Sequence, residues 1–145
     1  MPHEYEGHYK KKHPPSTQVS AEIETGVRQA TTNGKISCGG AHSLAKQLNR
    51  PPVEIGIAAD LQESKITDCQ LGLFGHDPAS ETVQKPLAEI DATLDSFIQN
   101  ALQDGRLSCI DAWTIADRLG ISRQEMGQAC ERKKIKINQC QIGAF

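Results

Sequence analysis

Two stretches of this chain have the apolar spacing of an amphipathic helix. Residues 16–33 and 86–104 each carry an apolar residue at every third or fourth position, so these side chains share one face of a helix. The apolar positions are Val19, Ile23, Val27 and Ala30 in the first stretch, and Ile90, Leu94, Ile98 and Ala101 in the second. We expect Ser16 to cap the first helix and Pro86 to be the first residue of the second.

A second and a third helix are predicted in each half of the chain. The second helices follow Ser37 and Ser108, whose hydroxyls can cap them. They end at Asn49 and Gly120, the residue types that best tolerate a left-handed backbone. Their apolar faces comprise Ala41, Leu44, Ala45 and Leu48, and Ala112, Ile115, Ala116 and Leu119. The third helices are predicted to begin at Pro51-Pro52 and at a capping box formed by Ser122 and Glu125.

These elements recur because the chain repeats part of its sequence at an offset of 71 positions. GKISC at 34–38 returns as GRLSC at 105–109, and CQLGLF at 69–74 returns as CQIGAF at 140–145. A repeat of this kind indicates two copies of one small domain. The copies are therefore interpreted as the products of an internal duplication.

The repeat predicts a domain organisation for the whole chain. We expect a flexible polar arm (residues 1–15), a first domain (16–75), a linker (76–85) and a second domain (86–145). In each domain a short strand, at 35–37 or 106–108, is expected to pair with a closing strand, at 65–74 or 136–145.

The second and third helices of each copy have the spacing of a helix-turn-helix motif. A small residue, a turn residue and a later apolar residue follow one another as Ala45, Asn49 and Ile55, and again as Ala116, Gly120 and Met126. With the preceding helix and the short strands, each copy resembles a winged-helix domain, and the CQ[LI]GxF ending is similar to that of tandem winged-helix proteins of bacterial type. The resemblance implies a mainly α fold with a small β component. Neither copy has room for a returning strand, so the hairpin wing is missing.

Composition limits the class of function. The net charge is −2 at pH 7, unlike that of a strongly basic nucleic-acid binder, although local basic patches remain compatible with it. We find no apolar run of membrane-spanning length and no signal-peptide core, and therefore expect a cytoplasmic protein without a membrane partner. The five cysteines are odd in number, which argues against a complete disulfide framework.

Few residues suggest catalysis or a cofactor. Cys38 with Cys69, and Cys109 with Cys140, could form a thiol switch or a metal site, but we favour buried cysteines that fill small apolar positions. The histidines and lysines of the arm could bind a metal or phosphate, and we favour a disordered terminus. The sequence contains no glycine-rich phosphate loop. We therefore expect no enzyme, no metal and no cofactor.

The third helices carry the candidate binding residues. In helix-turn-helix proteins the start and outer face of this helix read the major groove. The predicted DNA-binding residues of the second copy are Ser122, Arg123, Gln124, Gln128, Arg132, Lys133, Lys134 and Lys136. The same face of the first copy holds Pro52, Val53 and Ile57, followed by acidic residues, which favours contact with a protein or with a second copy.

Two hypotheses of function follow from the sequence. The first is a DNA-binding transcriptional regulator with tandem helix-turn-helix domains, in which the second domain is the main reader of double-stranded DNA. The alternative is a protein-interaction or assembly adaptor that keeps the fold without binding DNA. The acidic and apolar third helix of the first copy and the missing wings favour this alternative.

Overall fold

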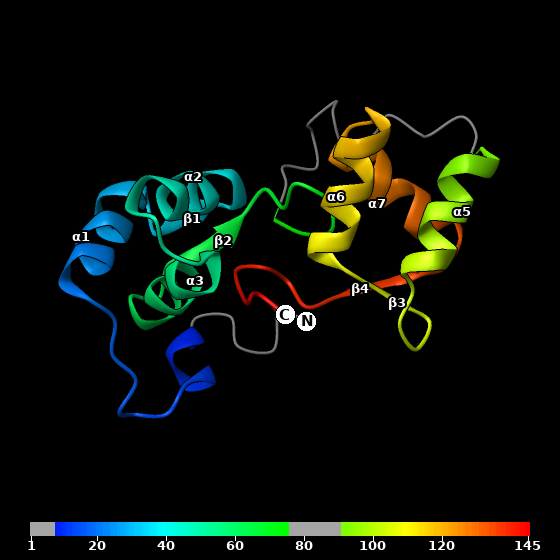
Figure 1. Cartoon of the computed structure of the whole chain (residues 1–145). Helices are drawn as coiled ribbons and strands as arrows, with labels where there is room; N and C mark the ends of the chain where they lie inside the picture. Colours follow the sequence, from blue (N-terminus) through cyan, green and yellow to red (C-terminus); the bar gives the residue numbers. More distant parts are fainter. Residues whose placement is uncertain (1–7, 76–90) are drawn as a thin grey trace. The chain divides into compact units, whose positions relative to one another are not determined.

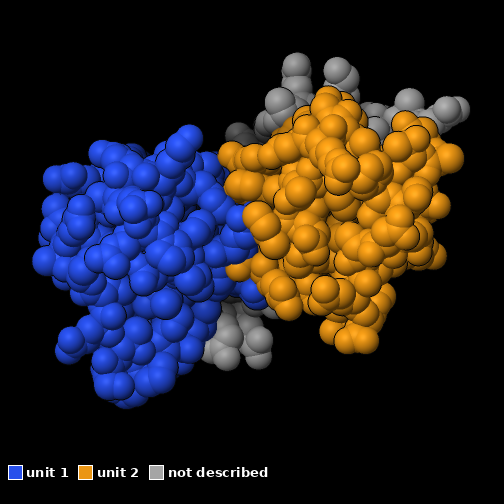
Figure 2. All heavy atoms as spheres, viewed as in Figure 1, with its two compact units in different colours: residues 1–69, 141–145 blue, residues 70–140 orange. Residues whose placement is uncertain are grey.

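The computed structural model describes residues 8–75 and 91–145, which form two compact units. Unit 1 comprises residues 1–69 and 141–145, and unit 2 comprises residues 70–140 (Figure 2). The described residues are mainly helical, with small sheets of two short strands. This confirms the expected fold class of a mainly α protein with a small β component. None of the described helices has the length and apolar character needed to cross a membrane.

The described residues of unit 1 form three α-helices and a two-stranded sheet (Figure 1). In chain order its elements are η2 (Tyr9–Lys12), α1 (Ala21–Ala30), β1 (Lys35–Ser37), α2 (Cys38–Leu48), α3 (Pro52–Leu61) and β2 (Lys65–Thr67). The strands are parallel, with Ile36 opposite Ile66. A parallel pair needs a crossover connection, and the two helices between the strands supply it.

The described elements of unit 2 have the same order as those of unit 1 from α1 onward. They are α5 (Ala92–Ala101), β3 (Arg106–Ser108), α6 (Cys109–Leu119), α7 (Arg123–Arg132) and β4 (Lys136–Asn138). Leu107 lies opposite Ile137 in a second parallel sheet. The backbone turns at matching places, since Asn49 has a φ of 54° and Gly120 a φ of 70° at the ends of α2 and α6.

Most helix ends lie where the sequence predicts them. The hydroxyls of Ser37 and Ser108 accept hydrogen bonds from the first turns of α2 and α6, and Ser122 begins α7 with a complete capping box. Pro51 is the N-cap of α3. These ends are predictable because each depends on residues within three or four positions of the cap.

The first helix of each unit begins later than expected. Ser20, rather than Ser16, caps α1, because Ser20 still has an extended backbone and its hydroxyl accepts a hydrogen bond from the Ile23 amide. Asp91 has the same role for α5 through the Leu94 amide. Pro86 lies outside the described residues, as does the expected linker at 76–85.

Each unit buries one apolar core between its helices and its sheet. The core is formed by Ile23, Val27, Ile36, Leu44 and Ile55 in unit 1, and by Leu94, Ile98, Leu107, Ile115 and Met126 in unit 2. Ala45 and Ala116 are fully buried on α2 and α6. Small side chains at these positions permit close helix packing within each helix–turn–helix pair.

The closing strands are shorter than predicted, and the chain then enters the other unit. β2 and β4 have three residues each. Asp68 and Gln139, which follow the strands, have φ values of 53° and 52°, and this left-handed backbone ends an extended strand. As a result, residues 70–75 belong to unit 2 and residues 141–145 belong to unit 1, which differs from the ranges expected from the repeat.

Candidate functional site

The outer face of α7 in unit 2 lies directly against the backbone of residue 71. A β-carbon added to Gly127 would be 1.9 Å from the carbonyl oxygen of Leu71 and 2.9 Å from its carbonyl carbon. Only glycine permits an approach this close. The Leu71 side chain is 2 % exposed, so its backbone packs on the helix and its side chain is buried. Gln124 also faces this segment, with its Cγ 4.0 Å from a β-carbon added to Gly72.

The outer face of α3 in unit 1 has the same arrangement. A β-carbon on Gly56 would lie 1.6 Å from the carbonyl oxygen of Ile142, and the Ile142 side chain is 1 % exposed. Gly143 has a φ of 73°, and a β-carbon there would be 3.9 Å from Cγ2 of Val53. Thus the third helix of each unit has its glycine-bearing face against a segment that forms a turn. We call residues 70–75 and 141–145 the docked segments.

The residues predicted as a protein-contact patch therefore lie beside a docked segment. Val53 is 46 % exposed on α3, next to Gly143. Pro52 and Ile57 are half-buried. Part of the apolar surface that the sequence assigned to a partner is thus adjacent to a segment of the same chain.

Arg123, the central residue of the predicted DNA-reading surface, is engaged on three sides. Its Nη1 donates a hydrogen bond to Oε1 of Gln70 at 2.6 Å. Its Nη2 is 3.1 Å from Oδ2 of Asp117, and its guanidinium lies over the Trp113 ring, 3.7 Å from the centroid. Arg123 therefore links the docked segment to α6 and α7.

Several of the other predicted DNA contacts serve the fold of unit 2. Ser122 caps α7 through the Glu125 amide, and Gln124 and Gln128 are half-buried. Lys133 donates a hydrogen bond to Asp95 on α5. That bond, opposed by partial desolvation, lowers the pKa of the Asp95 carboxyl below its ordinary value. The exposed members of the predicted set are Ser122, Arg132, Lys134 and Lys136.

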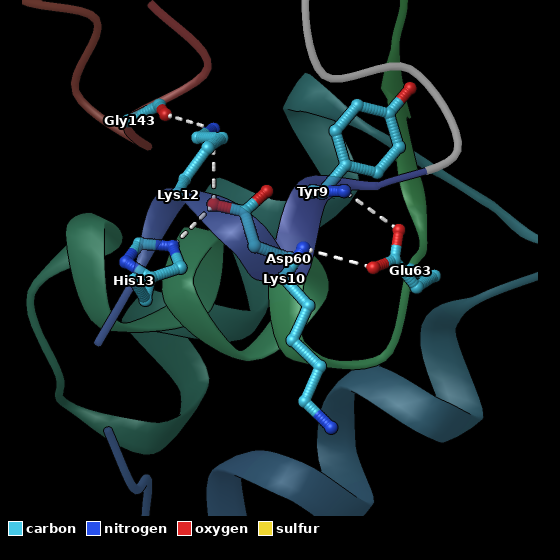
Figure 3. Close-up of polar contacts among 7 residues, drawn as sticks. All are labelled: Tyr9, Lys10, Lys12, His13, Asp60, Glu63 and Gly143. Carbon is cyan, nitrogen blue, oxygen red and sulfur yellow. Dashed lines mark hydrogen bonds and ion pairs between the residues drawn. The ribbon is translucent and has the colours of Figure 1, made fainter. Parts of the chain in front are cut away.

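The described part of the N-terminal arm, from residue 8 on, packs on α3. Glu63, just after α3, accepts hydrogen bonds from the backbone amides of Tyr9 at 2.8 Å and Lys10 at 2.9 Å (Figure 3). These amides belong to the first turn of η2, where backbone donors lack partners within the helix. Tyr9 is 8 % exposed. One carboxylate therefore fastens the start of the arm.

Asp60 fastens the end of the arm and connects it to the docked segment of unit 1. Its buried carboxylate, with the side chain 4 % exposed, lies 3.0 Å from Nζ of Lys12 and 2.7 Å from Nε2 of His13. The same Lys12 ammonium donates a hydrogen bond to the carbonyl oxygen of Gly143 at 2.9 Å. As Figure 3 shows, Lys12 stands between Asp60 and Gly143. The arm, α3 and residues 141–145 thus form one polar cluster.

Four of the five cysteines occupy equivalent places in the two units, and Cys130 has the place of Ala59. Cys38, Cys109 and Cys130 are buried, whereas Cys69 and Cys140 are half-buried beside the docked segments. Burial raises the pKa of the Cys130 thiol to about 11. Within residues 8–75 and 91–145, no group of three or more His, Cys, Asp or Glu side chains is arranged to hold a metal ion.

Sequence reasoning missed the glycines on the third helices. Gly56 and Gly127 occupy matching positions in the middle of helices, where glycine is unfavourable by about 1 kcal/mol relative to alanine. That shared cost is a sequence signal for close approach of another backbone.

Comparison of the chain with protein-family models, with curated proteins and with solved structures gave no match.

Proposed function

We propose that this protein is a protein-interaction adaptor in which the outer face of each third helix binds a short peptide segment in a turn conformation. The observation that carries the proposal is the contact of a peptide carbonyl with Gly127, repeated at Gly56. A helix face with a glycine at its centre, against which another backbone lies, has the character of a peptide receptor. The docked segments are the ligands that this chain supplies to its own receptors.

The docked segments indicate what such a receptor recognises. Leu71 and Ile142 occupy the same place and bury a branched aliphatic side chain. The glycine that follows each of them has a positive φ of 76° or 73°, a backbone that side chains other than glycine adopt at a cost. The receptor therefore favours an aliphatic residue followed by glycine, in a peptide turn with a polar residue before the aliphatic one.

The same arrangement weighs against base reading by α7. A recognition helix must present its side chains to base edges in the major groove. Gly127 and Gln124 face the docked segment, and Arg123 is bonded to Gln70 and Asp117. Base reading by this face would require the docked segment to leave and Arg123 to exchange its partners.

DNA binding is the second candidate, and one observation favours it. Lys134 and Lys136 are exposed near the end of α7, where they are suited to phosphate contacts. Contacts of this kind stabilise binding to any sequence and weaken as salt rises, because they act through counterion release. On this candidate the protein binds duplex DNA without the base discrimination expected of a specific regulator.

A peptide-binding experiment tests the proposal. The full-length Ile142→Asp variant has a disabled docked segment and an intact α3 face. We expect a peptide of residues 138–145 to bind this variant and to raise its melting temperature, because a ligand of the folded state stabilises that state. The matched control peptide carries Asp at position 142 and should not bind.

DNA binding, the competing function, is measured on the wild-type chain. Labelled random duplex DNA is titrated with the wild-type chain at low and moderate salt. The variants Lys134→Ala and Lys136→Ala are titrated in the same way as controls. Failure of the peptide to bind a folded Ile142→Asp variant would contradict the adaptor function. Sequence-selective DNA binding that disappears with Arg123→Ala would replace it with the regulator.

A further inference from the structure

We propose that the α3 face of unit 1 also binds residues 141–145 of a second copy of this chain, which gives an exchanged homodimer. The inference rests on the proposed function and names the partner of one receptor. The occupant follows from the structure, since residues 141–145 are the segment seated on α3. A second copy carries the same segment with the same chemistry. Exchange of an identical element between protomers is a low-cost route to a dimer.

Three contacts that hold this segment lie on two consecutive residues. They are the burial of the Ile142 side chain, the approach of its carbonyl to Gly56, and the hydrogen bond from Lys12 to the Gly143 carbonyl. Gln141 and Phe145 of the same segment make further interactions. Gln139, two residues before Gln141, has a φ of 52°, so the backbone turns between β4 and the segment.

Lys12 stabilises the docked segment and so acts as its latch. The latch is the same whether the segment comes from the same chain or from a second copy. Its ammonium bridges Asp60 and the Gly143 carbonyl. The closed monomer and the exchanged dimer contain the same latch, so its removal weakens both states alike. Loss of the latch should therefore accelerate segment exchange and leave the monomer–dimer equilibrium nearly unchanged.

Concentration sets which state is populated. A segment tethered to its own receptor has an effective concentration in about the millimolar range, so the closed monomer dominates at low protein concentration. The exchanged dimer becomes dominant when closure within one chain is blocked. A mixture of a variant that disables the receptor with one that disables the segment creates that condition, because neither chain can close on itself.

The test mixes two full-length variants with complementary defects. Gly56→Ala blocks the α3 face and keeps the segment, because its β-carbon would overlap the Ile142 carbonyl. Ile142→Asp disables the segment and keeps the face. Each variant alone should be monomeric, whereas the mixture should form a one-to-one heterodimer whose mass, measured by light scattering, is double that of either variant. The 138–145 peptide should dissociate this heterodimer.

Two controls keep the outcome interpretable. Helical circular dichroism verifies that each variant is folded, and Ile142→Ala is the milder substitute for the segment variant. A second measurement uses wild-type chains, in which both the α3 face and the segment are intact. Donor-labelled and acceptor-labelled wild-type chains are concentrated together, and energy transfer should develop as segments exchange, faster with Lys12→Met.

The outcomes separate this inference from the function on which it rests. If the peptide binds Ile142→Asp but the mixture remains monomeric and wild-type chains show no energy transfer, the homodimer is wrong and the peptide receptor stands. If the peptide also fails to bind the folded variant, both proposals are wrong.

Discussion

The carbonyl oxygen of Leu71 faces Gly127 at a separation that leaves no room for a β-carbon. Leu71 follows β2 of the first repeat, and Gly127 lies at the centre of α7 in the second. Ile142 and Gly56 have the reciprocal relationship in unit 1. Residues 70–75, which end the first repeat, therefore belong to the unit that contains α7 of the second repeat. Residues 141–145, which end the second repeat, belong to the unit that contains α3 of the first.

Gly127→Ala should displace the docked segment from α7. The added β-carbon would overlap the Leu71 carbonyl, and overpacking of this kind costs about 1–3 kcal/mol. The better helix propensity of alanine offsets about 1 kcal/mol of this cost. We expect a net loss in the free energy of unfolding, measured in urea with Trp113 fluorescence as the probe. Glu131→Ala, at an exposed position of the same helix, is the control and should change little.

Asp60→Ala should release the end of the N-terminal arm. Lys12 and His13 would lose their shared carboxylate, and hydrogen bonds to charged groups contribute about 1.5–3 kcal/mol each. Limited trypsin digestion should then cleave at the lysines of residues 10–12 faster than in the wild type. Glu131→Ala is again the matched control, because Glu131 occupies the place of Asp60 in the second repeat. Equal cleavage rates for Asp60→Ala and the wild type would contradict the fastening role.

The helices and most of their ends could be predicted from the sequence because their causes are local. Ser37 caps α2 through Gly40, and Asn49 ends the same helix with a left-handed backbone. These interactions span only a few residues. Ser16 and Ser20 both precede the first helix, and composition alone does not distinguish them. The extended backbone of Ser20 makes it the cap.

The docked segments could not be predicted because their partners are distant in the sequence. Residues 69–74 have the apolar character of a strand, and nothing local indicates which unit they join. The predicted roles of the candidate site residues also depend on partners that are distant in the sequence. Arg123 and Gln124 are residue types that read bases, but Arg123 is bonded to Gln70, which is 53 positions away. The glycines of the third helices were the available signal.

Cys130 should make the protein less stable at alkaline pH. Its thiol has an ordinary pKa of 9.0, and burial raises that pKa to about 11 in the folded protein. The unfolded chain therefore ionises first, so the contribution of this thiol is present below pH 9 and declines as pH rises toward 11. The free energy of unfolding should fall less between pH 8 and pH 10 in Cys130→Ala than in the wild type.

Alanine suits the site, because Ala59 occupies the matching place in unit 1. Identical pH dependence in the two proteins would show that Cys130 is not the cause.

Arg123→Ala should lower the stability of unit 2 and change the fluorescence of Trp113. The substitution removes a guanidinium 3.7 Å from the indole centroid and the hydrogen bond to Gln70. A cation–π contact contributes about 0.5–2 kcal/mol, according to how far it is desolvated. The free energy of unfolding in urea and the emission maximum of Trp113 measure the effect. Arg106→Ala, at an exposed position of β3, removes the same charge and should alter neither quantity.

If Arg123 instead reads bases, its loss should leave stability unchanged and reduce discrimination between DNA sequences by about 1–3 kcal/mol. A stable Arg123→Ala variant with unaltered Trp113 emission would therefore contradict the role of Arg123 in holding the docked segment.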